Sequence, residues 1–383
     1  MHFSSETNSV SLSIVIPVYN AEKWLSDCVR SALESYSGDL EVICVDDGST
    51  DASPTILDEL ASSNRIINVI HQPNQGRCAA RNTGIHHAKG TWITFLDADD
   101  QLMPDAWSNI LPKVDGSADL VCTFGKLEMN LTPLAFHMPI SSFDTTKLYP
   151  SEASEHLLAP ARYTRQCQRK DVKQVLEQFD EIWCLSSCTK LYRNLIIKKD
   201  NLGFTDRLVY GEDALFTFDY LPHVNGFVQY IAVPTYRYNI GNSGTTRKYR
   251  TGNLAALIKT LNAWQMRTES HHEQAELLHI ISFRCISDTL YTSMLAVYSL
   301  GFSLARNELA PLFTSKTIQY HCSNAVARQF RSINSITGPL WMLAFIFLNR
   351  QNEFAFLAVM AILSFLRFLG IALGGFFNKF VKH

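Results

Sequence analysis

The chain has 383 residues, of which 46% are hydrophobic and 18% are charged. This length exceeds that of a usual single domain, so we expect one α/β core of about 200 to 250 residues with appended segments. Its 34 basic and 36 acidic residues give a net charge of -2, which argues against a nucleic-acid partner. Its nine cysteines do not form the paired motifs of a zinc site, which favours reduced thiols in the cytoplasm.

The first 115 residues alternate apolar, partly β-branched runs with segments of helical periodicity. The runs predict four strands, over Leu12–Val18, 41–45, 66–70 and 92–96. The segments between them predict helices, one of them near 77–88. Short loops join these elements, so we expect a doubly wound, mostly parallel, Rossmann-like sheet of the α/β class.

Polar groups follow each predicted strand. They are Tyr19-Asn20, Asp46-Asp47, Asn74 to Gly76, and Asp97 to Asp100. Each group alone is compatible with ordinary turn chemistry. The carboxyl ends of parallel strands meet at one edge of a sheet, where open α/β sheets bind ligands, so the four groups together predict one binding site.

The cluster after the fourth strand is suited to a divalent metal. Mg²⁺ and Mn²⁺ take oxygen ligands and bind through one or two carboxylates plus phosphate oxygens. We expect Asp99 to bind the metal directly, Asp97 to reach the metal or a ribose hydroxyl, and Asp100 to contribute directly or through water. The alternative is that these acids only cap the helix that starts near Pro104.

Further polar residues suit a nucleotide ligand and a proton transfer. Asp47 could accept from the imide N–H of uracil or thymine, with Asp46 as a close competitor. Arg81 could bind a diphosphate, or form a surface salt bridge instead. Far along the chain, Asp213 of Gly211-Glu212-Asp213 could take a proton from an acceptor hydroxyl, although either acid could merely cap the helix that follows.

The second half of the chain changes character towards its end. Residues 131–170 lack sustained periodicity, 227–238 predict a strand and 252–330 predict helices. The tail has apolar runs over 338–348 and 354–377, and five basic residues against one acidic from residue 331 onward. Such a tail predicts a membrane contact, either a single span or an interfacial helix, with a buried core helix as the alternative.

Seven motifs in order carry a family resemblance over residues 11–247. They are Ile14–Asn20, Val45–Asp51, Asn74-Gln75-Gly76 with Ala80-Arg81-Asn82, Phe95–Asp100, Lys190–Arg193, Gly211–Asp213, and Tyr236–Tyr238 with Ser243. The chain closely resembles family 2 glycosyltransferases of the GT-A fold. The resemblance implies a donor site at the first three loops, a metal at the second or third acid of the Asp-x-Asp-like cluster, and a base at the later Glu-Asp pair.

These implications assign roles to Tyr19, Asp47, Arg81, Asp97, Asp99 and Asp213, and the remaining assignments are our own. The donor side takes Pro17, Tyr19, Asp46, Asp47, Arg81 and Asp97; the metal takes Asp99 with Asp97 and Asp100; the base is Asp213; the acceptor side takes Glu212 and Tyr238. We therefore expect a nucleotide-sugar-binding half (1–115), an acceptor-binding half (116–250), a helical extension (251–330) and a membrane-associating segment (331–383).

The expected reaction is inverting transfer of a sugar from a UDP-sugar to a glycan or lipid-linked acceptor, with Mn²⁺ or Mg²⁺, at the cytoplasmic face of the membrane. The chain lacks the Gln-x-x-Arg-Trp element of processive synthases, which favours one sugar per encounter. Two other classes stay open, a metal-dependent nucleotidyltransferase and a non-catalytic membrane scaffold. A dinucleotide-dependent oxidoreductase is disfavoured, because the turn at residues 17–21 contains no glycine.

Overall fold

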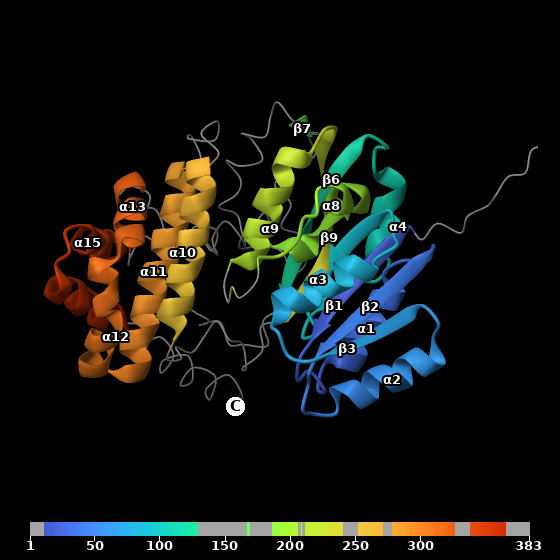
Figure 1. The fold of residues 1–383 in the computed structure, drawn as a ribbon, viewed down its shortest axis with the longest axis horizontal. Coiled ribbons are helices and arrows are strands. Elements are labelled where there is room, and N and C mark those ends of the chain that lie inside the picture. Colours follow the sequence, from blue (N-terminus) through green and yellow to red (C-terminus); the bar gives the residue numbers. More distant parts are fainter. Residues whose placement is uncertain are drawn as a thin grey trace, which may run out of the picture. The chain divides into compact units, whose positions relative to one another are not determined.

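The computed structural model divides the chain into two compact units. A sheet unit comprises Met1–Glu128, Glu155–Val175 and Trp183–Asn239, and a helical unit comprises Met129–Ser154, Leu176–Ile182 and Ile240–His383 (Figure 1). Within them the structure describes residues 11–128, 167–168, 186–205, 208, 211–239, 252–270, 278–325 and 338–364. The predicted irregular stretch 131–170, apart from 167–168, lies outside this part of the chain, as do Ser243 and the apolar run beyond residue 364.

The first half of the sheet unit is a parallel βαβ array. Its strands are β1 (Leu12–Val18), β2 (Leu40–Asp47), β3 (Ile67–Gln72) and β4 (Trp92–Phe95). They lie in the order β3-β2-β1-β4, and every neighbouring pair is parallel. The connecting helices are α1 (Leu25–Glu34), α2 (Ser53–Ser63) and α3 (Arg77–His87). The predicted doubly wound sheet is confirmed, and β1 and β2 are almost wholly buried, as their apolar runs require.

Helix α3 approaches β1 very closely at one glycine. A Cβ atom added to Gly84 would lie 2.3 Å from Cγ1 of Val15, so only glycine permits this approach. Arg81 lies three residues before Gly84 and therefore shares its face of the helix. The close approach of α3 to the sheet thus places Arg81 inside the protein.

The second half of the sheet unit adds antiparallel pairs to the array. Its strands are β5 (Gln101–Leu102), β6 (Ala118–Glu128), β7 (Cys167–Gln168), β8 (Lys190–Arg193) and β9 (Phe227–Asn239). The sheet continues from β4 as β8-β6-β9-β5, with β7 also on β9; only β6 and β9 are parallel here. The helical segments are α4 (Ala106–Ile110), η1 (Leu111–Lys113), η4 (Ser187–Thr189), α8 (Asn194–Lys199), α9 (Glu212–Tyr220) and η5 (Leu221–His223).

A cluster of buried aromatic rings fixes α9 against the sheet. Phe216 of α9 stacks on Phe204, with ring centroids 4.3 Å apart, and meets Tyr192 of β8 edge-on at 5.0 Å. Phe95, the last residue of β4, contacts all three rings. Each such pair contributes about 0.5–1.5 kcal/mol beyond its buried area. The first turn of α9 is therefore held near the end of β4.

The described part of the helical unit is built from α10 (Asn253–Ser270), α11 (Leu278–Leu300), α12 (Phe302–Thr314), α13 (Lys316–Asn324), α15 (Gly338–Asn349) and helical residues 353–364. The predicted helical C-terminal part is confirmed. His321 is fully buried in it, with its ring nitrogens 3.1 Å from Ser282 Oγ and from the Leu261 carbonyl oxygen. In the part of the chain that the structure describes, no helix combines the length and apolar character needed to cross a membrane.

Candidate active site at the carboxyl edge of the parallel strands

The loops after β1 and β2 are bound to each other. Asn20, in a left-handed conformation with φ 51°, accepts a hydrogen bond from the backbone N–H of Thr50 at 2.8 Å. Its own N–H donates to Ser49 Oγ at 3.0 Å. Just before Asn20, Pro17 is half-buried and Tyr19 is exposed, with 53% of its surface accessible. The loop after β1 therefore presents the Tyr19 ring to solvent at the carboxyl edge of the sheet.

The two aspartates that end β2 are both buried and hold different partners. Asp47 accepts from the backbone N–H groups of Gln75 and Gly76, at 2.9 and 2.8 Å, and from Gln72 Nε2 at 2.8 Å. Asp46 accepts from the Ser49 N–H at 3.0 Å, and its other oxygen lies 2.9 Å from His71 Nδ1. Asp47 thus shapes the turn that leads into α3. Recognition of a base by either aspartate stays a prediction.

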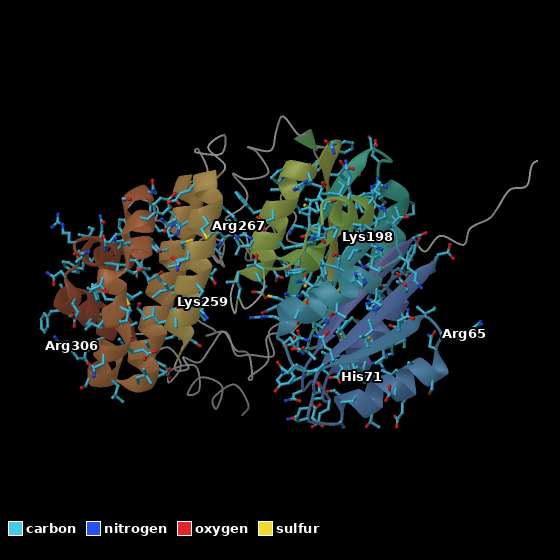
Figure 2. The ribbon with its side chains drawn as sticks, in the orientation of Figure 1. Arg65, His71, Lys198, Lys259, Arg267 and Arg306 are labelled. Atoms are coloured by element: carbon cyan, nitrogen blue, oxygen red, sulfur yellow. The ribbon has the colours of Figure 1, made fainter. Side chains whose placement is uncertain are left out.

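Both ring nitrogens of His71 face carboxylates. Nδ1 contacts Asp46, and Nε2 lies 3.2 Å from Asp58 Oδ1 on α2 (His71 is labelled in Figure 2). A nitrogen that faces a carboxylate oxygen is stabilised when it carries a proton. The hydrogen bond to Asp46 is the main cause that raises the pKa of His71 above its usual range. The imidazolium form therefore ties β3 to both β2 and α2.

Arg81 is a buried cation surrounded by three carboxylates. Its Nη2 lies 2.7 Å from Asp97 Oδ1, while Nη1 lies 3.0 Å from Asp213 Oδ1 and 3.2 Å from Glu212 Oε1. Its guanidinium also lies over the Phe204 ring, 5.0 Å from the centroid. The alternative of a surface salt bridge is wrong, because the side chain is only 1% exposed. In the structure the guanidinium of Arg81 contacts carboxylates. Binding of a diphosphate by Arg81 stays a prediction.

The three aspartates of the cluster after β4 have different environments. Asp100 is buried and accepts from Tyr236 Oη at 2.6 Å and from the Asn239 N–H at 2.7 Å. Asp97 is held by Arg81, and Asp99 is exposed at the edge. Asp99 is therefore the aspartate of the cluster most open to a metal ion. The Asp100 carboxylate is hydrogen-bonded to β9.

Crowding of these carboxyl groups shifts their protonation. Partial withdrawal from water, followed by the neighbouring charge of Asp97, raises the pKa of Asp99 to about 6. Burial, then the charges of Asp97 and Asp99, raises the pKa of Asp100 to about 8. A cation placed beside Asp99 and Asp97 would relieve this repulsion. Among the described residues, no group of three or more His, Cys, Asp or Glu side chains is arranged to hold a metal ion.

The Glu-Asp pair begins helix α9, directly after Gly211 with φ 71°. Glu212 is buried, and its Oε1 binds both Arg77 Nε, at 3.0 Å, and Arg81. The Asp213 side chain is 26% exposed and accepts from Ser187 Oγ at 2.9 Å. Burial, partly offset by Arg81, raises the pKa of Asp213 to about 6. Asp213 can therefore reach solvent and titrates near neutrality, as a general base requires.

The structure joins four of the residues that the sequence singled out by direct contacts, leaves Tyr19, Asp46 and Asp47 with other partners or with solvent, and adds further residues. Arg81 joins Asp97 to Glu212 and Asp213, and Tyr238 lies half-exposed near the end of β9. Tyr236, Ser187 and Arg77 were not among the predicted site residues. Tyr236 lies in the Tyr236-Arg237-Tyr238 motif, so the motif held a signal for it, whereas no sequence pattern points to Ser187.

A parallel βαβ half with carboxylates after β4, joined through Arg81 to an acidic pair at the start of α9, agrees with the order of motifs that carries the family resemblance. Residues 13–195 match the model of the family "Glycosyl transferase family 2". This part of the chain is a family 2 glycosyltransferase domain, which confirms the resemblance seen in its motifs.

Relatives and solved structures agree with this assignment. EpsH of Bacillus subtilis, a protein assigned as a glycosyltransferase, is 32% identical over 247 residues, which cover 64% of either chain. The chondroitin synthase of Escherichia coli is 38% identical over 136 residues, 34% of this chain and 20% of that protein. The chain thus spans less than two thirds of the length of these relatives. Staphylococcus aureus TarS 1-349, solved with UDP-GlcNAc, shares the fold with a TM-score of 0.51 and 15% identity, covering 91% of this chain and 90% of that one.

Proposed function

We propose that the chain transfers a sugar from a nucleotide-diphosphate donor to an acceptor hydroxyl, with inversion at the anomeric carbon. The observation that carries this proposal is that Arg81 binds two carboxylates, Asp97 and Asp213, whose surroundings suit them to different roles. On one side Arg81 binds Asp97, next to the exposed Asp99; on the other it binds Asp213, a half-buried carboxylate suited to take a proton. The proposed site for the leaving diphosphate, at Asp97 and Asp99, and the proposed site for the attacking hydroxyl, at Asp213, are thus both attached to the buried guanidinium of Arg81.

The donor is proposed to be a UDP-sugar. Asp46 and Asp47 end β2 at the same edge as Tyr19, where their hydrogen bonds to the Ser49 and Gln75 N–H groups shape the loops that would surround a base. The solved TarS structures that share the fold hold UDP and UDP-GlcNAc, which supports this choice of nucleotide. The Tyr19 ring is exposed beside this loop and could stack on the base.

Mn²⁺ or Mg²⁺ is the proposed cofactor, held by Asp99 and Asp97. The exposed carboxylate of Asp99, crowded by Asp97, fits a hard cation that prefers one or two carboxylates and substrate oxygens. When bound, the ion would neutralise charge on the departing diphosphate. Hydrogen bonds from Tyr236 and Asn239 to the Asp100 carboxylate attach the cluster to β9.

Asp213 is proposed to remove the proton from the acceptor hydroxyl. Its raised pKa of about 6 leaves it ionised at neutral pH and basic enough to accept a proton. Direct attack on the anomeric carbon from the face opposite the leaving group inverts its configuration. An α-linked nucleotide sugar therefore gives a β-linked product.

The proposed acceptor is a glycan or a lipid-linked glycan at the cytoplasmic face of a membrane, within cell-surface polysaccharide synthesis. Relatives named as chondroitin and hyaluronan synthases support a polysaccharide context. In the helical unit, Leu304 and Phe354 are 63% and 77% exposed; Leu304 precedes Arg306 by two residues, and Phe354 directly follows Glu353, its ion-pair partner (Arg306 is labelled in Figure 2). Exposed apolar residues and a basic tail support contact with anionic lipid.

Vesicle flotation tests this membrane contact. The full-length chain should float with vesicles that contain phosphatidylglycerol, and it should bind less well when Leu304 and Phe354 are both changed to Ser. A double change of the exposed Leu195 and Ile66 to Ser, in the sheet unit, is the matched control. Equal binding by both double variants would remove Leu304 and Phe354 from the contact.

A donor screen tests the reaction itself. Purified protein is incubated with several UDP-sugars, with and without Mn²⁺, and release of UDP is measured. Metal-dependent UDP release supports glycosyl transfer, whereas pyrophosphate release from a sugar phosphate and UTP would support the nucleotidyltransferase alternative. NMR coupling constants of the new linkage decide between inversion and retention.

A further inference from the structure

The carboxylate of Asp213 is held through one of its two oxygens. Ser187 Oγ donates to Oδ1 at 2.9 Å, and Arg81 Nη1 lies 3.0 Å from the same atom. Among the described residues, no donor contacts Oδ2. Two donors on one oxygen from different directions fix the carboxylate plane and leave the other oxygen to accept a proton.

Ser187 is itself rigid. It is fully buried and begins η4, the turn that leads directly into β8. The preceding residue, Ser186, caps this turn by accepting from the Cys188 N–H at 3.1 Å, and it does not contact Asp213. The hydroxyl of Ser187 therefore approaches Asp213 from a position set by the sheet, not by a mobile side chain.

Helix α9 is attached to η4 and β8 along one face. Asp213 binds Ser187, Thr217 Oγ1 lies 2.8 Å from Tyr192 Oη, and Tyr220 Oη accepts from the Arg193 N–H at 3.0 Å. Positions 213, 217 and 220 lie at helical spacings of four and three, so they share a face. The two later contacts hold the helix, and the first contact alone orients the carboxylate.

The charges around Asp213 make this orientation necessary. Arg81 and Arg77 of α3 attract it, while Glu212 on its own helix and Asp97 after β4 repel it. Without a second donor on Oδ1, the carboxylate would be free to rotate towards the guanidinium with both oxygens, because Arg favours bidentate pairing. A carboxylate bound in this way is a poorer proton acceptor and is turned away from an incoming hydroxyl.

We propose that Ser187 is a positioning residue for glycosyl transfer, which with Arg81 holds Oδ1 of Asp213 so that Oδ2 takes the proton of the acceptor hydroxyl. The proposal rests on the proposed function of Asp213 as the base. The reacting groups are unchanged: the acceptor O–H bond breaks, its proton passes to Oδ2, and the acceptor oxygen bonds to the anomeric carbon as the nucleotide diphosphate leaves. Ser187 neither gains nor loses a proton.

The test compares Ser187→Ala with Ser187→Cys, which keeps the shape of the side chain at a slightly larger size and offers a weaker donor, and with Ser186→Ala as the matched control in the same turn. Ser187→Ala should lower kcat by about 10- to 100-fold, since a misplaced catalytic group costs up to about 10²-fold. The KM for the donor should stay within about twofold of that of the wild type. Ser187→Cys should fall between wild type and Ser187→Ala, and Ser186→Ala should keep a near wild-type kcat.

A double-mutant cycle separates positioning from mere structural support. If Ser187 acts through the base, Ser187→Ala should lower kcat in the wild type but have almost no effect in an Asp213→Asn background. An equal loss in both backgrounds overturns the proposal, as does wild-type kcat for Ser187→Ala. If Ser187→Ala does not fold, the same cycle with Ser187→Cys decides by the same criterion. Absence of transfer by the wild type with every donor would refute the proposed function instead.

Discussion

Replacing Arg81 with Met should destabilise the sheet unit severely. Methionine keeps an unbranched apolar side chain, shorter than that of arginine, but removes the cation that three carboxylates share. Removal of one partner from a buried ion pair costs about 3–5 kcal/mol, because it leaves a buried charge without compensation. The Asp97 and Asp213 side chains are 32% and 26% exposed and can partly rehydrate, and Glu212 keeps Arg77. We therefore expect a loss near the lower limit, about 3 kcal/mol.

The effect should depend on pH in a defined direction. Arg81 stabilises the fold only while its carboxylate partners are ionised, and burial already raises the pKa of Asp213 to about 6. As pH falls through this range Asp213 becomes protonated and its pairing with Arg81 is lost, so the difference between wild type and Arg81→Met should shrink. At pH 8 the difference should be largest.

Urea unfolding, followed by pulsed hydrogen exchange in peptides of β1 and β2, measures the stability of the sheet unit separately. Arg30→Met is the matched control, because Arg30 and its partner Asp27 are 62% and 53% exposed. That variant should lose no more than about 0.5 kcal/mol. A loss below about 1 kcal/mol for Arg81→Met, or a loss that grows towards acid pH, would refute the view that this cation holds the acidic groups together.

Asp213→Asn should lower kcat by about 10²- to 10⁴-fold while donor affinity, measured by titration, stays within about threefold; a variant that cannot bind donor would place Asp213 on the nucleotide side. Since ionised Asp213 is the active form and burial raises its pKa to about 6, wild-type kcat should rise with pH through about 6, and a flat profile from pH 5 to 7 would contradict this. Asp99→Asn should abolish transfer, because an amide is a poorer ligand for a hard cation than a carboxylate. Near wild-type activity of this variant in saturating Mn²⁺ would falsify the role of Asp99 as a metal ligand. The hydrogen bond to Asp46 raises the pKa of His71 in the folded protein. The contribution of His71 to the stability of the fold is therefore complete below about pH 6.5, and it is lost as pH rises through the raised pKa. His71→Gln should therefore abolish that alkaline decline in urea stability, and an unchanged decline would exclude His71 as its cause.

The parallel half of the fold follows from local pattern alone. Apolar runs such as Leu12–Val18 specify strands buried on both faces, and short helical segments between them permit only right-handed parallel crossovers. Because parallel strands end at the same edge, Asp46, Asp47 and Asp97 had to lie near one another. The gathering of these acidic residues at one edge of the sheet could thus be predicted without a structure.

The division of roles among the acids depends on contacts distant in sequence. Arg81 meets Glu212 across 131 positions, and Asp100 meets Tyr236 across 136. A linear pattern shows that several carboxylates are present, but burial and hydrogen-bond partners decide which of them is exposed, paired or raised in pKa. The tertiary structure alone therefore separates Asp99, open to a cation, from Asp100, which is bonded to β9.

Ser187 could not have been predicted from the sequence. A serine before a short strand is common and carries no periodicity or charge that could mark it out. It meets Asp213 only because β8 joins the sheet antiparallel to β4, and α9 then packs across that junction through Phe216, Tyr192 and Phe95. Strand order and helix packing are decided by the burial of the whole apolar surface at once, so they fix this contact where no local rule can.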